Sequence, residues 1–194
     1  AQYMIDHSRI IFNGNGYSEE WVREAARRGL PNLPSMVDAI PALTTERSVA
    51  LFEKFGIFTR AELESRAEVM YETYAKTVNI EAQTMVHMAG KHYIPAVIHY
   101  VTRLANSVNA VRAACAEADI SAQRELLLRC SALLASAREA LTRLECVTER
   151  TNAIEAVQDM ANAFHSEVVP AMAELRSTID ELELLVDKDM WPVP

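Results

Sequence analysis

Residues 94–115 read IPAVIHYVTRLANSVNAVRAAC, and the apolar side chains of this stretch recur in alternating steps of three and four. That spacing places them along one side of an α-helix. We expect the helix to begin near Thr59, so that its fifty-odd residues span roughly 80 Å at about 1.5 Å per residue. Such a rod must protrude or be covered by other helices. Its second-half stripe consists of Ile94, Val97, Val101, Leu104, Val108, Val111 and Cys115.

The first half of the same helix begins with a capping box, in which Thr59 and Glu62 satisfy each other's backbone groups. Pro95 lacks an amide proton and crowds the carbonyl four residues earlier, so we expect a kink near Lys91. Polar residues lie close to the seam, where they face solvent, set the register or meet a partner outside the chain. The predicted stripe is Leu63, Ala67, Met70, Tyr74, Thr77, Glu81, Met85 and Met88, with Asn79 beside it.

Two further helices repeat the three-and-four spacing. We expect the long helix to end near 118, a second helix capped by Ser121 to span 121–149, and a third, bent by Pro170, to span 153–188. Short connections make consecutive helices antiparallel neighbours. The pattern therefore predicts an all-α fold, a long-helix antiparallel three-helix coiled-coil bundle over residues 59–190. The two stripes are Leu127, Cys130, Leu134, Ala137, Leu141, Leu144 and Thr148, then Ile154, Val157, Ala161, Phe164, Val168, Met172, Leu175, Ile179, Leu182 and Val186.

Residues 1–58 form a short irregular and helical N-terminal segment. Residues 9–12 have the composition of a strand and precede a turn at 13–16, but no second strand candidate follows. A lone strand cannot satisfy its own backbone, so this stretch either pairs with a partner outside this chain or lies as coil. We also expect a helix that is capped by Ser18 and stops at Gly29, and a second that begins at Thr44 or Thr45 and stops at Gly56.

Composition narrows the classes of function. A net charge of −8 argues against nucleic acid and against a basic membrane-binding face. The sequence shows no apolar run of membrane-spanning length, and we expect a soluble, cytoplasmic protein. Cys115, Cys130 and Cys146 lie on the helical stripes, so the pattern favours buried, reduced thiols.

No residue pattern predicts an active site. Gly14 and Gly16 lack the third glycine of a dinucleotide fingerprint, because Glu19 occupies its place. The histidines lack the Glu-x-x-His pairs of di-iron bundles, and we interpret the methionines near Tyr93 as core rather than as a ligand pocket. We therefore predict no catalytic, cofactor-binding or metal-binding residue. The candidates considered are His87, His92, His99, His165, Met85, Met88, Glu145, Glu149 and Arg150.

Longer segments resemble type III glutamine synthetases, the large bacterial form of that enzyme. They are RIIFNGNGYSEEWV (9–22), FTRAELESR (58–66), KTVNIEA (76–82), VPAMAELR (169–176) and WPVP (191–194). The resemblance covers nearly the whole chain and is weakest at about 105–151. It implies the C-terminal region of a glutamate–ammonia ligase that uses ATP and Mg²⁺ or Mn²⁺ and forms ring-shaped homo-oligomers.

The resemblance also implies that the catalytic, ATP-binding and metal-binding residues lie N-terminal to this chain, and that the chain stops shortly before the enzyme's last residues. The chain would then brace the catalytic part or join subunits, and the lone strand would belong with the missing part. An alternative is a free-standing helical interaction module, such as a sensor or adaptor. Asn79 and Glu81 are the polar seam positions most worth mutating under either hypothesis.

Overall fold

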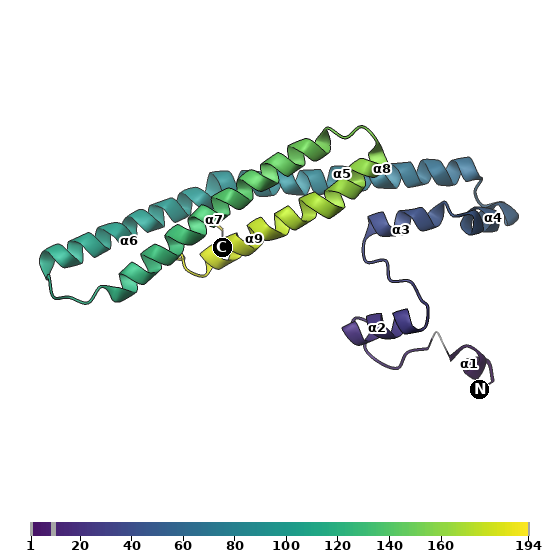
Figure 1. Ribbon diagram of the computed structural model, residues 1–194, viewed down its shortest axis with the longest axis horizontal. Helices are drawn as coiled ribbons and strands as arrows, with labels where there is room; N and C mark the ends of the chain where they lie inside the picture. Colours follow the sequence, from purple (N-terminus) through teal and green to yellow (C-terminus); the bar gives the residue numbers. More distant parts are fainter. Residues whose placement is uncertain (1, 9–10, 194) are drawn as a thin grey trace.

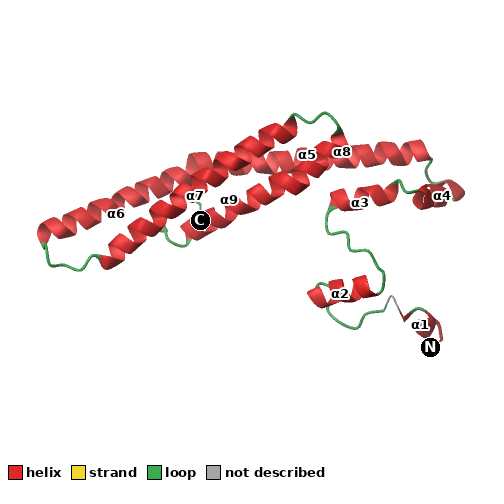
Figure 2. Ribbon diagram, viewed as in Figure 1, coloured by secondary structure: helices red, strands yellow, loops and turns green. Residues whose placement is uncertain are grey.

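The structure is a computed structural model that describes residues 2–8 and 11–193. Every regular element in those ranges is a helix (Figures 1 and 2). The all-α prediction is therefore confirmed. Of the predicted strand, Arg9 and Ile10 lie outside the described residues, and Ile11 and Phe12 are coil. The N-terminal helices are α1 (Gln2–Asp6), α2 (Glu19–Arg27), α3 (Met36–Leu43) and α4 (Glu46–Lys54).

The predicted long helix runs without a break from Arg60 to Ala114. It consists of α5 (Arg60–Met88), a π-helical turn η2 (Ala89–Tyr93) and α6 (Ile94–Ala114). The capping box at its start is confirmed, because the Thr59 hydroxyl accepts from the Glu62 backbone amide and the Glu62 carboxylate accepts from the Thr59 amide. The rod ends four residues earlier than predicted, since Cys115 is extended.

The second and third rods follow the predicted order with shifted ends. Helix α7 (Ser121–Asn152) extends beyond its predicted end at residue 149. The third rod comprises α8 (Val157–Ala163), the π-helical turn η3 (Phe164–Val168) and α9 (Val169–Glu183). Ser121 was expected to cap α7 but is its first residue. The Asp119 carboxylate instead accepts from the Ser121 amide at 2.9 Å. The N-cap position of α7 is Ile120, and Asp119, two residues before Ser121, thus satisfies one of the free amides at the helix start.

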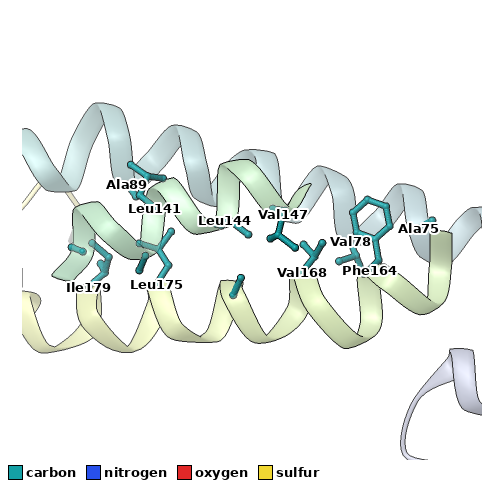
Figure 3. Close-up of a cluster of buried hydrophobic side chains, with 14 of the residues drawn as sticks. Ala75, Val78, Ala89, Leu141, Leu144, Val147, Phe164, Val168, Leu175 and Ile179 are labelled. Atoms are coloured by element: carbon teal, nitrogen blue, oxygen red, sulfur yellow. The ribbon is translucent and has the colours of Figure 1, made fainter. Parts of the chain in front are cut away.

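The three rods lie side by side, and each connection reverses the chain direction (Figure 1). One contiguous core joins them, with Leu141, Leu144, Phe164 and Leu175 all at most 1 % exposed. Figure 3 shows these side chains directed from α7, η3 and α9 toward the backbone of α5. Bulky residues of two rods therefore pack onto the third.

Downstream of Tyr71, the side of the long rod that faces this core carries small residues, which corrects part of the predicted stripe. Downstream of Ala67 the buried positions are Tyr71, Ala75, Val78, Ala82 and Ala89. Most of the residues predicted to form the buried stripe precede a buried position by one residue and are not themselves buried. Met70, Tyr74, Met85 and Met88 are half-buried, and Thr77 and Glu81 are exposed.

The stripe of the third rod is confirmed at most positions, because Ala161, Phe164, Val168, Leu175, Ile179, Leu182 and Val186 are buried. Val157 and Met172 are only half-buried, and Ile154 lies before α8 begins and is half-buried too. Within α7 the predicted positions from Cys130 to Thr148 are buried except for Leu134, which is half-buried. Two of the three cysteines contradict the prediction of buried thiols, because Cys115 and Cys146 are exposed while Cys130 is fully buried. Burial raises the pKa of the Cys130 thiol.

Each rod that contains an internal proline has a π-helical turn just before it. Pro95 follows η2 and Pro170 follows η3, both near the start of the next helix. The Ile94 amide donates to the carbonyl of Ala89, and the Val169 amide donates to that of Phe164, so each bond spans five residues. The wider turn accommodates a ring that lacks an N–H and that would crowd the carbonyl four residues back. Where the sequence predicted a kink near Lys91 and a bend at Pro170, the structure has the π-helical turns η2 and η3.

The N-terminal segment joins the bundle through α3. Val37 and Ile40 are buried in the common core, whereas α1 and α2 lie apart from the three rods (Figure 1). The predicted cap at Ser18 and the predicted stops at Gly29 and Gly56 are confirmed, and both glycines have positive φ, which residues with a β-carbon rarely adopt.

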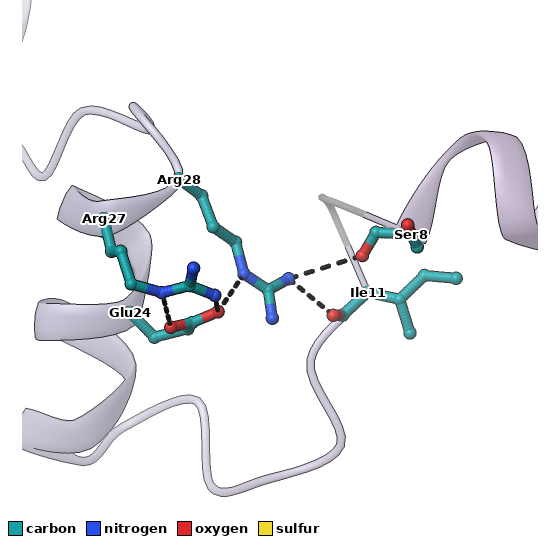
Figure 4. A network of polar contacts seen from close by, with 5 residues as sticks. All are labelled: Ser8, Ile11, Glu24, Arg27 and Arg28. Carbon is teal, nitrogen blue, oxygen red and sulfur yellow. Dashed lines mark hydrogen bonds and ion pairs between the residues drawn. The ribbon is translucent and has the colours of Figure 1, made fainter.

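A charged network holds α2 to the preceding loop (Figure 4). The Glu24 carboxylate accepts hydrogen bonds from Arg27 and Arg28, and Arg28 also donates to the backbone carbonyls of Ser8 and Ile11. Hydrogen bonds first from Arg27 and then from Arg28 lower the pKa of Glu24 from 4.5 to about 2. The charged form of Glu24 is therefore the one that the folded segment favours.

Replacing Leu144 by alanine should lower the free energy of unfolding by about 2–5 kcal/mol, because the side chain is fully buried between rods and leaves a cavity. Denaturant unfolding followed by circular dichroism measures the change. Leu184→Ala is the matched control, because Leu184 is 86 % exposed and its truncation should change stability by less than about 0.5 kcal/mol. Equal effects of the two substitutions would contradict the packing described here.

The Glu24 network should respond to acid. Because the folded pKa lies below 4.5, its stabilising contribution is complete above pH 4.5 and is lost as the pH falls through about 2. Carbon-detected NMR titration of the Glu24 carboxyl should show a midpoint near 2. In the Arg27→Gln, Arg28→Gln variant the midpoint should move back toward 4.5. A midpoint near 4.5 in the unaltered chain would rule the network out.

Candidate functional site

The C-terminal turn covers the junction between α5 and α6. After α9 ends at Glu183, the chain reverses at Asp187, whose carbonyl accepts from the amides of Met190 and Trp191. The Asp187 carboxylate pairs with Arg103 of α6 at 3.0 Å. The Trp191 ring stacks on Tyr93 of η2, with centroids 5.0 Å apart and planes inclined by 14°. An ion pair and an aromatic stack thus fix the turn to the long rod.

This turn closes one side of a cavity of about 280 Å³ between α5, η2 and α9. Met85, Met88 and Tyr93, considered from the sequence as a possible ligand pocket, do line it together. We interpreted these residues as core, and the structure places all three as half-buried residues of the cavity wall. The other lining residues include Leu175, Ile179 and Trp191, with Arg176, Asp180 and Glu183 supplying the charged groups.

The chemistry of this cavity is that of a binding surface. Its walls are thioether, aliphatic and aromatic groups, and Arg176 is 3.4 Å from Asp180. The indole nitrogen of Trp191 is buried and has no hydrogen-bond acceptor among the described residues. Thioether and aromatic walls accommodate an apolar side chain or a small apolar ligand.

A second polar cluster links α3, α5 and η3. The Tyr74 hydroxyl lies 3.2 Å from Nδ1 of His165, and Nε2 of His165 lies 3.8 Å from the Asp38 carboxylate. Burial, followed by the nearby charges of Asp38 and Glu81, raises the pKa of Tyr74, so the phenol stays protonated at neutral pH. Through half-buried His165 of η3, the cluster ties the N-terminal segment to the bundle.

The remaining sequence candidates are scattered. The rings of His87 and His92 meet edge to face with centroids 5.6 Å apart, and His99 is exposed. Arg150 pairs with Glu167, while Glu145 and Glu149 are exposed. Asn79 accepts a hydrogen bond from Asn152 at 3.0 Å, a polar contact between α5 and the end of α7. Among the described residues, no three His, Cys, Asp or Glu side chains form a group that could hold a metal ion.

Comparison with known proteins adds to this geometry. Residues 1–112 match the family described as "Glutamine synthetase C-terminal domain". The chain belongs to this family. The resemblance to type III glutamine synthetases found in the sequence is thereby confirmed.

Relatives of this glutamine synthetase domain align along almost the whole chain. A protein named "Glutamine synthetase" from Butyrivibrio fibrisolvens is 32 % identical over 191 residues, which cover 98 % of this chain and 27 % of the relative. The "Type-3 glutamine synthetase" of Dictyostelium discoideum is 32 % identical over 195 residues, covering 98 % and 26 %. A "Glutamine synthetase" of Bacteroides fragilis (strain YCH46) is 33 % identical over 195 residues, covering 98 % and 27 %. The chain spans about a quarter of the length of these relatives.

Glutamine synthetases use ATP and a divalent metal. The described residues of this domain do not fit such a metal, because their donor side chains are dispersed along three rods. None of the described helices combines the length and apolar character needed to cross a membrane.

The pairing of Trp191 with Tyr93 was not predicted from the sequence of this glutamine synthetase domain. Trp191 lies in the turn after α9 and Tyr93 lies in η2 of the long rod, so no local periodicity links them. A usable signal exists in the sequence, since Trp191 is one of only two tryptophans and sits in a Pro-flanked segment that follows the last apolar stripe. An aromatic residue at such a place has to be covered by another element.

Trp191→Ala should release the C-terminal turn. The substitution removes at least the roughly 0.5–1.5 kcal/mol that an aromatic pair contributes beyond area burial. Hydrogen exchange should then show lower protection at residues 185–191, with α7 unchanged. Trp191→Phe keeps the stack and should preserve most of the protection, and Tyr17→Ala, at a fully exposed ring, is the matched control. Unchanged protection in Trp191→Ala would show that the stack does not hold the turn.

Proposed function

We propose that this chain is the non-catalytic helical region of a type III glutamine synthetase, and that it braces the catalytic part and joins subunits. The observation that carries the proposal is the alignment over 98 % of this chain with relatives of which it spans only 26–27 %. The region is present along its whole length within longer enzymes, and its core consists of packed helices. Both features suit a structural role within the enzyme. The whole enzyme would make glutamine from glutamate, ammonia and ATP.

In this proposal the remainder of the synthetase supplies the ATP site and the Mg²⁺ or Mn²⁺ ligands. The three rods wrap as an antiparallel coiled coil over residues 59–190, which the three-and-four spacing of their buried residues supports. Exposed apolar side chains on the N-terminal segment, such as Met4, Ile5 and Tyr17, provide surface for the catalytic part. The enzyme is a cytoplasmic homo-oligomer.

The half-covered cavity beneath Trp191 suits the same role. An apolar side chain from another part of the synthetase would enter between Met88, Ile179 and Trp191 without any chemical step. Burial of one leucine-sized side chain there would contribute roughly 1.5–3 kcal/mol to association. The cavity therefore supports an assembly function more directly than a catalytic one.

The proposal predicts that the isolated chain makes no glutamine. Purified chain incubated with glutamate, ammonia, ATP and Mg²⁺ or Mn²⁺ should release no phosphate above the protein-free rate. The full-length product of the natural gene, measured in parallel, should turn over. Turnover by the isolated chain would overturn the proposal. A natural gene product with the intact mass of this chain alone would favour the free-standing interaction module instead.

A further inference from the structure

The π-helical turn η2 brings two histidines of the long rod together. His87 lies near the end of α5, and His92 lies within η2, five positions further along the chain. In a regular α-helix, side chains five positions apart point about 140° away from each other, so their rings would not meet. In the structure the two rings meet edge to face, with centroids 5.6 Å apart and planes inclined by 67°.

The added residue of the π-helical turn explains this contact. Two side chains five positions apart across such a turn stand where side chains four positions apart stand on an α-helix. The hydrogen bond from the Ile94 amide to the Ala89 carbonyl has the five-residue span of this turn. Two histidines four positions apart on one helix face are a recurring zinc-binding arrangement. The backbone at η2 therefore gives His87 and His92 the spacing of a two-histidine metal site.

The separation of the two rings suits one shared ion. An imidazole nitrogen binds Zn²⁺ at about 2.0–2.1 Å, so each ring centroid would lie about 3.2 Å from the ion and the two centroids at most about 6.4 Å apart. The observed 5.6 Å lies inside this limit. Both side chains are exposed, so rotation about their side-chain bonds can turn a nitrogen of each ring toward the ion.

The pair is available for binding and selects a class of ion. His165, which lies in the other π-helical turn, already faces Tyr74 and Asp38 through its two ring nitrogens. His87 and His92 instead face solvent. Imidazole is a good ligand for Zn²⁺, Cu²⁺ and Ni²⁺, whereas Mg²⁺ takes oxygen ligands. The pair therefore differs in chemistry from a Mg²⁺ site.

We propose that His87 and His92 together bind one divalent transition-metal ion that prefers nitrogen ligands, for which Zn²⁺ is the probe. Water completes the coordination. The ion joins the end of α5 to η2 and stabilises the π-helical turn, because only the folded turn holds both rings in reach of one ion. With two protein ligands rather than the four of a structural zinc site, we expect a Kd on the order of 1–100 µM. The site is independent of the assembly role proposed above.

A titration of the folded chain with Zn²⁺, followed by NMR of isotope-labelled histidine rings, tests the proposal. The measurement resolves each ring, so Zn²⁺ bound by the exposed thiols of Cys115 and Cys146 is not mistaken for binding at the pair. The test variants are His87→Ala and His92→Ala. His99→Ala is the matched control, because His99 is exposed on the same rod but lies in α6, outside the π-helical turn.

We expect the resonances of His87 and His92 to shift with one common midpoint, and those of His99 to stay in place at that concentration. Loss of a group that merely supports a metal ligand costs about 10–100-fold in affinity, so removal of either ligand should weaken binding at least about tenfold. His99→Ala should leave the midpoint unchanged. Zn²⁺ should raise the melting temperature of the unaltered chain but not that of the two test variants. Mg²⁺ should shift neither ring.

Separate midpoints for the two rings, no shift of either below about 1 mM, or an equal response to Mg²⁺ would overturn the proposal. It would also fail if either test variant bound Zn²⁺ as tightly as the unaltered chain, or if His99→Ala weakened binding equally. Circular dichroism confirms that the variants are folded, as expected for substitutions of exposed side chains. The glutamine assay measures none of these properties, so this proposal and the proposed function can fail separately.

Discussion

Alanines on α5 and η2 set how closely the other two rods approach the long rod. Ala75, Ala82 and Ala89 present almost no side chain, so Phe164, Leu141 and Leu175 can reach the helix backbone and exclude water along the seam (Figure 3). Large residues opposite small ones fill the space between helices at the density typical of protein interiors. The long rod has no comparable support beyond Val97, where its apolar residues are only partly covered.

Prolines shape two of the three rods without breaking them. A proline inside a helix ordinarily removes one hydrogen bond and crowds the preceding turn. At Pro95 and Pro170 a π-helical turn absorbs this conflict and adds one residue to the turn. Each π-helical turn also contains one residue of a contact between distant segments. Tyr93 of η2 stacks on Trp191, and His165 of η3 lies beside Tyr74.

The distribution of charge divides the molecule along its length. Arginines in the middle of the bundle pair with carboxylates of the neighbouring rod, as Arg143 does with Glu174. Arg112, Arg124, Arg129 and Arg138, on the outer part of α6 and α7, form no ion pair with the described residues, whereas at the start of α5 Arg60 pairs with Glu46 and Glu64. For a domain of the glutamine synthetase family that spans a quarter of its longer relatives, unpaired charge beside partly covered apolar surface is consistent with contacts that one isolated copy leaves unmade.

The sequence by itself determined the helical class, the order of the rods, the caps at Ser18 and Thr59, the stops at Gly29 and Gly56, and the family. Each depends on local backbone chemistry, on apolar residues spaced three and four apart, or on long segments of sequence similarity. Only the tertiary structure decided which face of α5 is buried, since an alanine seam is chosen by the size of Phe164 and Leu141 on other rods. Only the tertiary structure also showed that Trp191 pairs with Tyr93 and that Cys115 is exposed. A contact between distant segments, and the point at which neighbouring helices stop covering a rod, produce no repeating pattern of apolar residues in the sequence.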